Sequence, residues 1–152
     1  MIGLLQRVSR ASVEVAGQCI ATIGPGLLVL VGVEQDDTAV QVRRLLERIL
    51  AYRVFSDAEG RMNRSLRETG GGLLLVPQFT LAADTRKGNR PGFSPAAPPE
   101  QGRELFESLC GLARAAHPEV GCGAFGADMQ VELVNDGPVT FWLQTGSAIE
   151  PA

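Results

Sequence analysis

The feature that most constrains the fold is an apolar run, residues 27–33, that directly follows a Gly-Pro-Gly sequence at residues 24–26. Six of its seven residues are leucine or valine. A short, continuous run of this kind between turn signals is typical of a buried β-strand. A second strongly apolar run, residues 73–81, follows three consecutive glycines and predicts another strand. Both strands need other elements packed over them, so the chain must also supply covering helices.

Two segments have the periodicity of amphipathic helices. The first places its apolar residues at helical spacing: Val42, Leu45, Leu46 and Ile49. Charged residues occupy its other face, and Asp36-Asp37 is expected to cap its N-terminus. The second helix is expected from Pro99 to His117, because proline suits a first helical turn and apolar residues then recur at helical spacing.

The other segments have strand character. Further strands are expected over residues 1–8, 12–16, 19–23, 52–55, 129–133 and 139–145. Residues 56–60 and 135–138 have turn composition, and residues 146–152 are expected to form a loose tail. The order of elements predicts one α+β domain, residues 1–152, in which a mainly antiparallel β-sheet folds on itself, barrel-like, with two helices.

Composition excludes several classes of protein. The chain has 152 residues, 45% of them hydrophobic and 20% charged, as in an ordinary globular domain. Its apolar runs are much shorter than the roughly 18 residues of a membrane span. Residues 1–7 lack the basic-then-apolar order of a signal peptide. We therefore expect a cytoplasmic protein with no membrane contact.

Few side chains are suited to acid–base or nucleophilic catalysis. His117 is the single histidine and Lys87 the single lysine of the sequence. A serine triad would have only His117 as its base, and Lys87 lies in a polar segment unsuited to a desolvated Schiff base. The three cysteines (Cys19, Cys110 and Cys122) have no zinc-site spacing and are expected to be reduced and buried. No metal site is therefore predicted.

The charge is unevenly distributed. The whole chain has a formal net charge of −3, whereas residues 61–90 contain six basic and two acidic residues, a net charge of +4. A local basic surface on an acidic protein can bind phosphates while the rest discourages nonspecific binding. Ordinary solvated loops would have the same composition, so charge alone leaves both interpretations open.

Two short segments depart from local rules. In the first, Pro77 interrupts an apolar run, and Gln78 and Thr80 are expected on one face of a strand with Phe79 on the other. An amide and a hydroxyl side by side can orient a carbonyl or a water, although an edge strand with a polar outer face would look the same. The second segment, residues 135–140, is first of all a hairpin turn between two strands.

At these residues the sequence resembles the D-aminoacyl-tRNA deacylases, the D-tyrosyl-tRNA deacylase family. The resemblance covers nearly the whole chain through motifs in a fitting order. They are Gln6-Arg7-Val8 with Ala11-Ser12-Val13, residues 26–33, Tyr52-Arg53-Val54-Phe55, Met62-Asn63-Arg64-Ser65-Leu66, Gln78-Phe79-Thr80-Leu81, Arg90-Pro91-Gly92-Phe93, Phe125-Gly126-Ala127-Asp128-Met129 and Asn135-Asp136-Gly137-Pro138-Val139-Thr140. Eight such matches in order are specific, where one would be weak.

The resemblance implies a homodimer with active sites at the subunit interface and no cofactor. A cis Gly137-Pro138 bond would enter the partner's pocket, where its carbonyls exclude the side chain of an L-amino acid. The pocket would receive the 3′-terminal adenosine and the aminoacyl ester of a tRNA, and the tRNA's own 2′-hydroxyl would assist hydrolysis. The residues implied are Thr80 and Gln78 as catalytic, and Phe79, Gly137, Pro138, Arg7, Met129 and Phe125 as substrate-binding. The basic segment supplies the expected RNA-binding residues, Arg86, Lys87 and Arg90.

The family motif has a serine where this chain has Pro77, which supplies neither a hydroxyl nor an N–H. Three functions remain open on the sequence. The leading one is hydrolysis of D-aminoacyl-tRNA, including the achiral glycyl-tRNA. A related deacylase for another mischarged amino acid is the second. The third is a noncatalytic module that binds tRNA or protein and has kept the fold.

Overall fold

The computed structural model describes residues 1–146, and the expected tail from residue 147 onward lies outside the described residues. Its strands are β1 (Ile2–Val15), β2 (Gln18–Ile23), β3 (Gly26–Gly32), β4 (Arg53–Ser56), β5 (Met62–Ser65), β6 (Gly72–Pro77), β7 (Val120–Cys122) and β8 (Gln130–Gln144). Its helices are α1 (Ala39–Ala51), α2 (Leu66–Thr69), the 3₁₀ turn η1 (Phe79–Ala82) and α3 (Pro99–Ala116).

The long strand β1 organises the main sheet. One of its edges pairs with β3 over its first half and with β2 over its second half, while β8 follows the other edge along its whole length. These three pairings are antiparallel, and β6 and β7 extend the sheet in parallel beyond β3. The prediction of an α+β fold with a mainly antiparallel, barrel-like sheet is confirmed.

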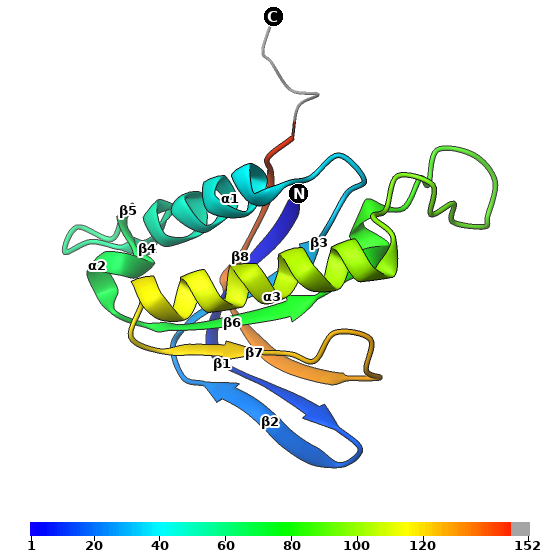
Figure 1. Cartoon of the computed structure of the whole chain (residues 1–152). Coiled ribbons are helices and arrows are strands. Elements are labelled where there is room, and N and C mark those ends of the chain that lie inside the picture. The colour runs from blue at the N-terminus through cyan, green and yellow to red at the C-terminus, as the bar shows by residue number, and fades with distance from the viewer. Residues whose placement is uncertain (147–152) are drawn as a thin grey trace, which may run out of the picture.

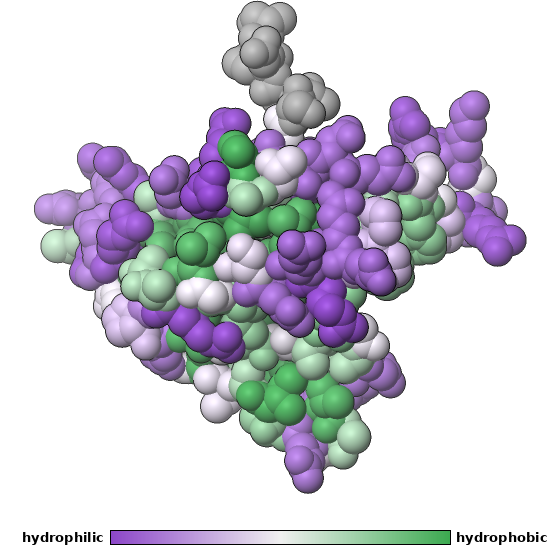
Figure 2. All heavy atoms as spheres, viewed as in Figure 1, coloured by the Kyte–Doolittle hydropathy of each residue, from purple (hydrophilic) through white to green (hydrophobic). Residues whose placement is uncertain are grey.

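Helices α1 and α3 lie side by side over one face of the sheet (Figure 1). The two apolar runs that suggested buried strands form the adjacent strands β3 and β6. Apart from the half-buried Leu30, their leucines and valines are buried against the helices and the rest of the sheet. On the face that Figure 2 shows, polar residues surround apolar residues that lie between α1 and α3, and a second group of apolar residues lies at the lower end, over β2. No helix within residues 1–146 is long and apolar enough to cross a membrane.

The number of helices was predicted wrongly, because residues 1–146 contain three α-helices and a 3₁₀ turn. The additional helix, α2, is a single turn whose N-cap Ser65 forms a capping box with Glu68, and Gly70 ends it in the left-handed conformation. One turn is too short for a hydrophobic period to be visible in the sequence. Strands β5 and β7 were also missed, since each has only three or four residues.

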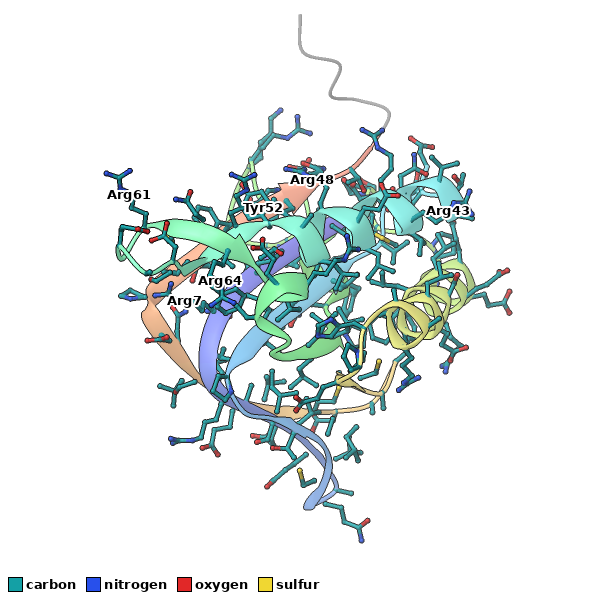
Figure 3. All side chains as sticks on the ribbon, turned by 90° about the vertical axis from the view of Figure 1, so that its left-hand side faces the viewer. Arg7, Arg43, Arg48, Tyr52, Arg61 and Arg64 are labelled. Carbon is teal, nitrogen blue, oxygen red and sulfur yellow. The ribbon has the colours of Figure 1, made fainter. Side chains whose placement is uncertain are left out.

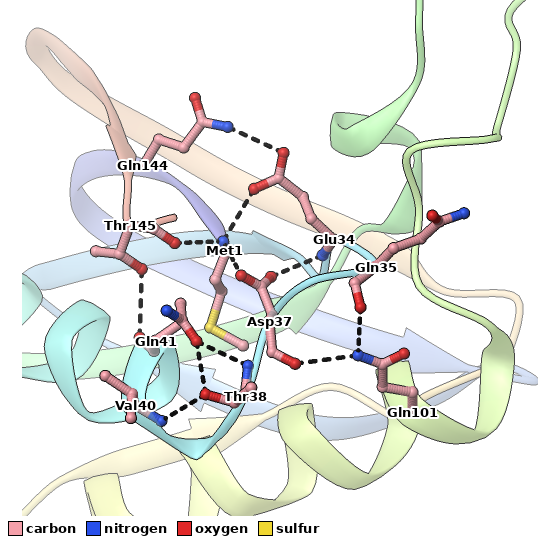
Figure 4. A network of polar contacts seen from close by, with 10 residues as sticks. All are labelled: Met1, Glu34, Gln35, Asp37, Thr38, Val40, Gln41, Gln101, Gln144 and Thr145. Carbon is pink, nitrogen blue, oxygen red and sulfur yellow. Dashed lines mark hydrogen bonds and ion pairs between the residues drawn. The ribbon is translucent and has the colours of Figure 1, made fainter. Parts of the chain in front are cut away.

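The predicted cap of the first long helix was also wrong. Thr38 caps α1 and forms a capping box with Gln41. Asp37 instead binds the α-amino group of Met1, which donates hydrogen bonds to Asp37 Oδ1 (2.5 Å), Glu34 Oε2 (3.0 Å) and the carbonyl of Thr145 (2.6 Å) (Figure 4). Burial raises the pKa of Asp37, and the neighbouring amino group opposes that rise. The cluster fastens β1 to the loop before α1 and to the residue that follows β8.

Two local predictions near the expected site were wrong. The strand expected over residues 73–81 ends at Pro77, and residues 79–82 turn into η1. The segment at residues 135–138 is no hairpin turn, because β8 continues through it and pairs with β1 on both sides.

Candidate functional site

The main cavity lies where β6 ends. It has a volume of about 470 Å³ and is lined by residues from β3, β6, η1, the start of α3 and the segment before β8. Four of the predicted site residues line this cavity, namely Gln78, Phe79, Phe125 and Met129. Pro77 lines it as well. None of the residues that line the cavity has a titratable side chain. Any reaction in it depends on positioning and hydrogen bonding.

The 3₁₀ turn brings the two polar side chains together. The backbone N–H of Gln78 donates to the carbonyl of Val31 (2.7 Å), which fastens the turn to β3. The side-chain amide of Gln78 then donates to the hydroxyl oxygen of Thr80. The two side chains therefore meet through the turn of the backbone, and the predicted arrangement on one strand face is incorrect. Within residues 1–146, no hydrogen bond uses the Thr80 hydroxyl proton or the Gln78 side-chain carbonyl.

The opposite wall of the cavity is apolar. Phe125 packs against Phe106 with ring centroids 6.5 Å apart, and the guanidinium of Arg103 lies 5.2 Å from its ring centroid. Gly102 leaves room for this ring, because a Cβ there would lie 3.2 Å from Phe125 Cζ. Phe125 and Phe106 line the same cavity as Gln78, and such an aromatic surface suits a flat apolar group.

The Gly137-Pro138 bond is cis, which confirms the prediction made from the family resemblance. Between the pairs Gln6/Thr140 and Val8/Asn135, β8 has four residues where β1 has only Arg7, so this segment bulges from the sheet. Gly137 has φ of +135°, a conformation that L side chains rarely adopt.

Arg7 and Asn135 hold this bulge. Arg7 Nε donates to the carbonyl of Asp136 (3.1 Å), and Arg7 Nη1 donates to the carbonyl of Val54 (2.8 Å). The amide of Asn135 donates to the carbonyls of Arg7 (2.9 Å) and Val139 (3.1 Å). Arg7 Nε also lies 3.6 Å from the carboxylate of Asp136, and the Thr140 hydroxyl donates to Asn135 Oδ1 (3.2 Å). Four hydrogen bonds to backbone carbonyls and these two side-chain contacts hold the bulge in place.

The predicted substrate-binding residues therefore form two groups in a single chain. Gln78, Phe79, Phe125 and Met129 line the main cavity, with Thr80 hydrogen-bonded to Gln78. Arg7 and Asp136 line a second cavity of about 370 Å³ beside Gly137-Pro138. The two cavities share no lining residue within the described part of the chain.

The predicted RNA-binding residues lie on the loop between η1 and α3. Arg86 forms an ion pair with Asp84, with Nη2 and Oδ2 2.8 Å apart, and this guanidinium holds the pKa of Asp84 well below its usual range. Lys87 and Arg90 are exposed, and neither has an ion-pair partner among residues 1–146. They are the more available cations of the loop.

A second basic surface is visible only in the folded chain. Arg43 and Arg48 project from α1, and Arg61 and Arg64 from the β4–β5 hairpin, on the same side of the molecule (Figure 3). Arg48 lies over the ring of Tyr52 with its guanidinium 5.8 Å from the centroid. Only Arg61 and Arg64 belong to the basic segment recognised in the sequence, because the others are spread along a helix.

His117 and the cysteines lie away from the site. His117 is buried at the C-cap of α3, and its Nε2 donates to the carbonyl of Gly71 (2.6 Å). Cys110 is buried and Cys122 half-buried, but Cys19 is exposed, against the expectation that all three are buried. None of these residues lines either cavity.

Comparison with known proteins supports the family that the sequence motifs indicated. The family model described as D-Tyr-tRNA(Tyr) deacylase matches residues 4–144. The D-aminoacyl-tRNA deacylase of Alkalilimnicola ehrlichii is 65% identical over 144 residues, 95% of this chain and 96% of that protein. The protein of the same name from Nitrosococcus oceani is 59% identical over 152 residues, 100% of this chain and 98% of the relative.

Two solved structures share the fold. One, named c-Myc DNA Unwinding Element Binding Protein, has a TM-score of 0.92 and 39% identity and covers 97% of this chain and 100% of its own. The other, a probable eukaryotic D-amino acid tRNA deacylase, has a TM-score of 0.81 at 20% identity, over 93% and 97% of the two chains. The fold, the cavity and the close relatives define a hydrolytic enzyme. The chain belongs to the D-Tyr-tRNA(Tyr) deacylase family.

Proposed function

We propose that this protein hydrolyses the ester bond of D-aminoacyl-tRNA and releases the D-amino acid and free tRNA. The observation that carries the proposal is the cavity, which is lined by Gln78, the hydrogen-bond partner of Thr80, and by aromatic residues, and whose lining has no titratable side chain. Its size suits one ligand as large as an aminoacyl-adenosine. The relatives at 59–65% identity carry the name of this activity.

In the proposed reaction, water adds to the ester carbonyl and the bond between that carbon and the ribose oxygen breaks. The proton lost by the water ends on the ribose oxygen, which becomes a free hydroxyl. Gln78 and Thr80 orient the ester by hydrogen bonds, and the tRNA's own 2′-hydroxyl assists in place of a side-chain base. This assignment agrees with the position of His117, which is engaged by Gly71 outside the cavity.

Chirality is read by exclusion in a homodimer. In this proposal the rigid Gly137-Pro138 bulge of one protomer enters the main cavity of its partner, which would unite the two residue groups that are separate in a single chain. The outer edge of β8 pairs with no strand among the described residues, and Trp142 on β8 is 52% exposed. An unpaired edge strand with exposed apolar residues favours association with a second copy.

A filter that only excludes L side chains also accepts substrates that have no side chain. Rigid carbonyls can reject an L side chain, but glycine has no side chain to reject. We therefore include glycyl-tRNA mischarged on tRNA-Ala among the substrates, which would make the enzyme a proofreading factor of translation in the cytoplasm. The exposed Lys87 and Arg90 would contact the tRNA phosphates.

A noncatalytic nucleic-acid-binding function is the second candidate. It is favoured by the structural similarity to a protein named for binding a DNA element and by Pro77, which removes a hydroxyl from the cavity wall. A deacylation assay on D-aminoacyl-, L-aminoacyl- and glycyl-tRNA separates the candidates. We expect rapid release from the D and glycyl forms and little from the L form. Equal rates for D and L, or no release from the D form, would contradict the proposed function.

A further inference from the structure

Two exposed phenylalanines stand at the mouth of the main cavity. Phe79 is 57% exposed and lines the cavity, and Phe93 is 42% exposed on the loop that carries the basic residues. Their ring centroids are 5.2 Å apart with the planes tilted by 50°. Large aromatic side chains cost free energy when left in water, so an exposed pair beside a binding cavity needs an explanation.

The backbone holds Phe93 in position. Asp84 and Gly92 exchange two hydrogen bonds, of 2.7 and 3.0 Å, immediately before it. Immediately after it, Ala96 N–H donates to the Phe93 carbonyl (3.1 Å), and Gln35 N–H donates to the Pro95 carbonyl (3.1 Å). These contacts tie a long loop to β3 and to η1 through their flanking residues. A partner that stacks on Phe93 therefore meets a ring whose backbone is already ordered.

The cavity has room for one nucleoside with its ester, so the nucleotide that precedes the terminal adenosine must lie outside it. A strand leaving the cavity beside Phe79 meets the ring of Phe93 next, and Lys87 and Arg90 lie on the same loop to receive its phosphates. Aromatic rings flanked by cations are the standard means of binding an unpaired nucleic acid end.

We propose, on the basis of the proposed function, that Phe93 stacks on the penultimate base of the unpaired 3′ end of the tRNA, with Phe79 packed behind it. Phe93 is thus a positioning residue that aligns the terminal ester with Gln78 and Thr80. It acts on full-length tRNA and not on a substrate that ends at the terminal nucleoside.

The test compares Phe93→Ala and Phe93→Trp on two substrates, D-aminoacyl-tRNA and D-aminoacyl-adenosine. We expect Phe93→Ala to raise KM for the tRNA by about 5- to 150-fold, the effect of losing one stacked base, and to leave hydrolysis of the aminoacyl-adenosine unchanged. Phe93→Trp should restore activity on the tRNA, because stacking needs only a flat ring. Val40→Ala on α1, where Val40 is 49% exposed, is a matched control for loss of a surface apolar side chain.

A second measurement does not depend on catalysis. An oligonucleotide with 2-aminopurine at its penultimate position should lose fluorescence on binding the wild-type protein and the Val40→Ala variant, but not Phe93→Ala. The proposal would be overturned if Phe93→Ala lost activity equally on the tRNA and on the aminoacyl-adenosine, or kept full activity on both. A change of oligomeric state in Phe93→Ala would also overturn it, since the ring would then belong to a subunit contact. If the wild-type protein hydrolyses neither substrate, the proposed function fails, while quenching by Phe93 still reports the stacking site.

Discussion

Replacing Gly137 with alanine tests whether the bulge in β8 acts as the chirality filter. A Cβ at this position would lie 2.9 Å from the backbone N of Val139 and 3.2 Å from a guanidinium nitrogen of Arg7. Both contacts are too short, and the neighbouring atom of Val139 is backbone, so the bulge must move. The backbone conformation at φ +135° also costs a residue with a side chain about 1–3 kcal/mol.

These effects predict two measurable changes. For a domain of this length the strain alone should lower Tm by about 2–4 °C for each kcal/mol. A displacement of about 1 Å at a catalytic site typically costs about 100-fold in rate, so hydrolysis of D-aminoacyl-tRNA should fall by that order. Size-exclusion chromatography should still show the proposed dimer, because the side chains of β8 outside the bulge, Trp142 among them, are unchanged.

Gly60→Ala is the matched control. Gly60 also has a positive φ, of +80°, but a Cβ there meets nothing within 4 Å, and the residue lines neither cavity. We expect it to lower Tm and leave the deacylation rate unchanged. The filter hypothesis is refuted if Gly137→Ala is as active as Gly60→Ala while its Tm shows that the strain was introduced.

Three further predictions concern the side chains around the site. His117→Ala should keep its deacylation rate but lower the free energy of unfolding by about 1–3 kcal/mol, since the Gly71 carbonyl loses its donor; loss of activity in the folded variant would reinstate a histidine base. Lys87→Gln should reduce the slope of log K for tRNA binding against log salt concentration by about 0.7–0.9. Arg86→Gln should reduce it by less, because Arg86 already pairs with Asp84. Equal reductions for the two variants in filter-binding assays would contradict this difference. Arg86 lowers the pKa of Asp84 in the folded state. The pair therefore stabilises the fold at pH values above the ordinary pKa of an aspartate, and this stabilisation is lost as the pH falls and Asp84 becomes protonated. NMR titration of Asp84 should give a midpoint below 3.8 that rises in Arg86→Gln, and an unshifted midpoint would contradict the pairing.

The long amphipathic helix α3 and the buried strands β3 and β6 could be predicted from the sequence because their signals are local. Apolar periodicity and punctuation by glycine and proline depend only on neighbouring residues, and they located α3 at Pro99–Ala116 within one residue. Ordered motifs also identified the family, because a match of spacing needs no coordinates, and the site residues predicted from them stay a prediction.

Tertiary contacts decided the geometry of the site. The turn after Pro77 depends on a hydrogen bond from Gln78 to Val31 in another strand, so local propensity predicted a continuing strand and missed it. The bulge at Gly137-Pro138 is held by Arg7, which lies 129 residues from Asp136 in the sequence, and in isolation the same residues have the composition of a hairpin turn. The contact between the tilted rings of Phe79 and Phe93 likewise depends on the hydrogen bonds between Asp84 and Gly92, which close the loop between them. The sequence thus determined the long helices, the buried strands and the family, whereas long-range hydrogen bonds between distant segments determined how the predicted site residues meet.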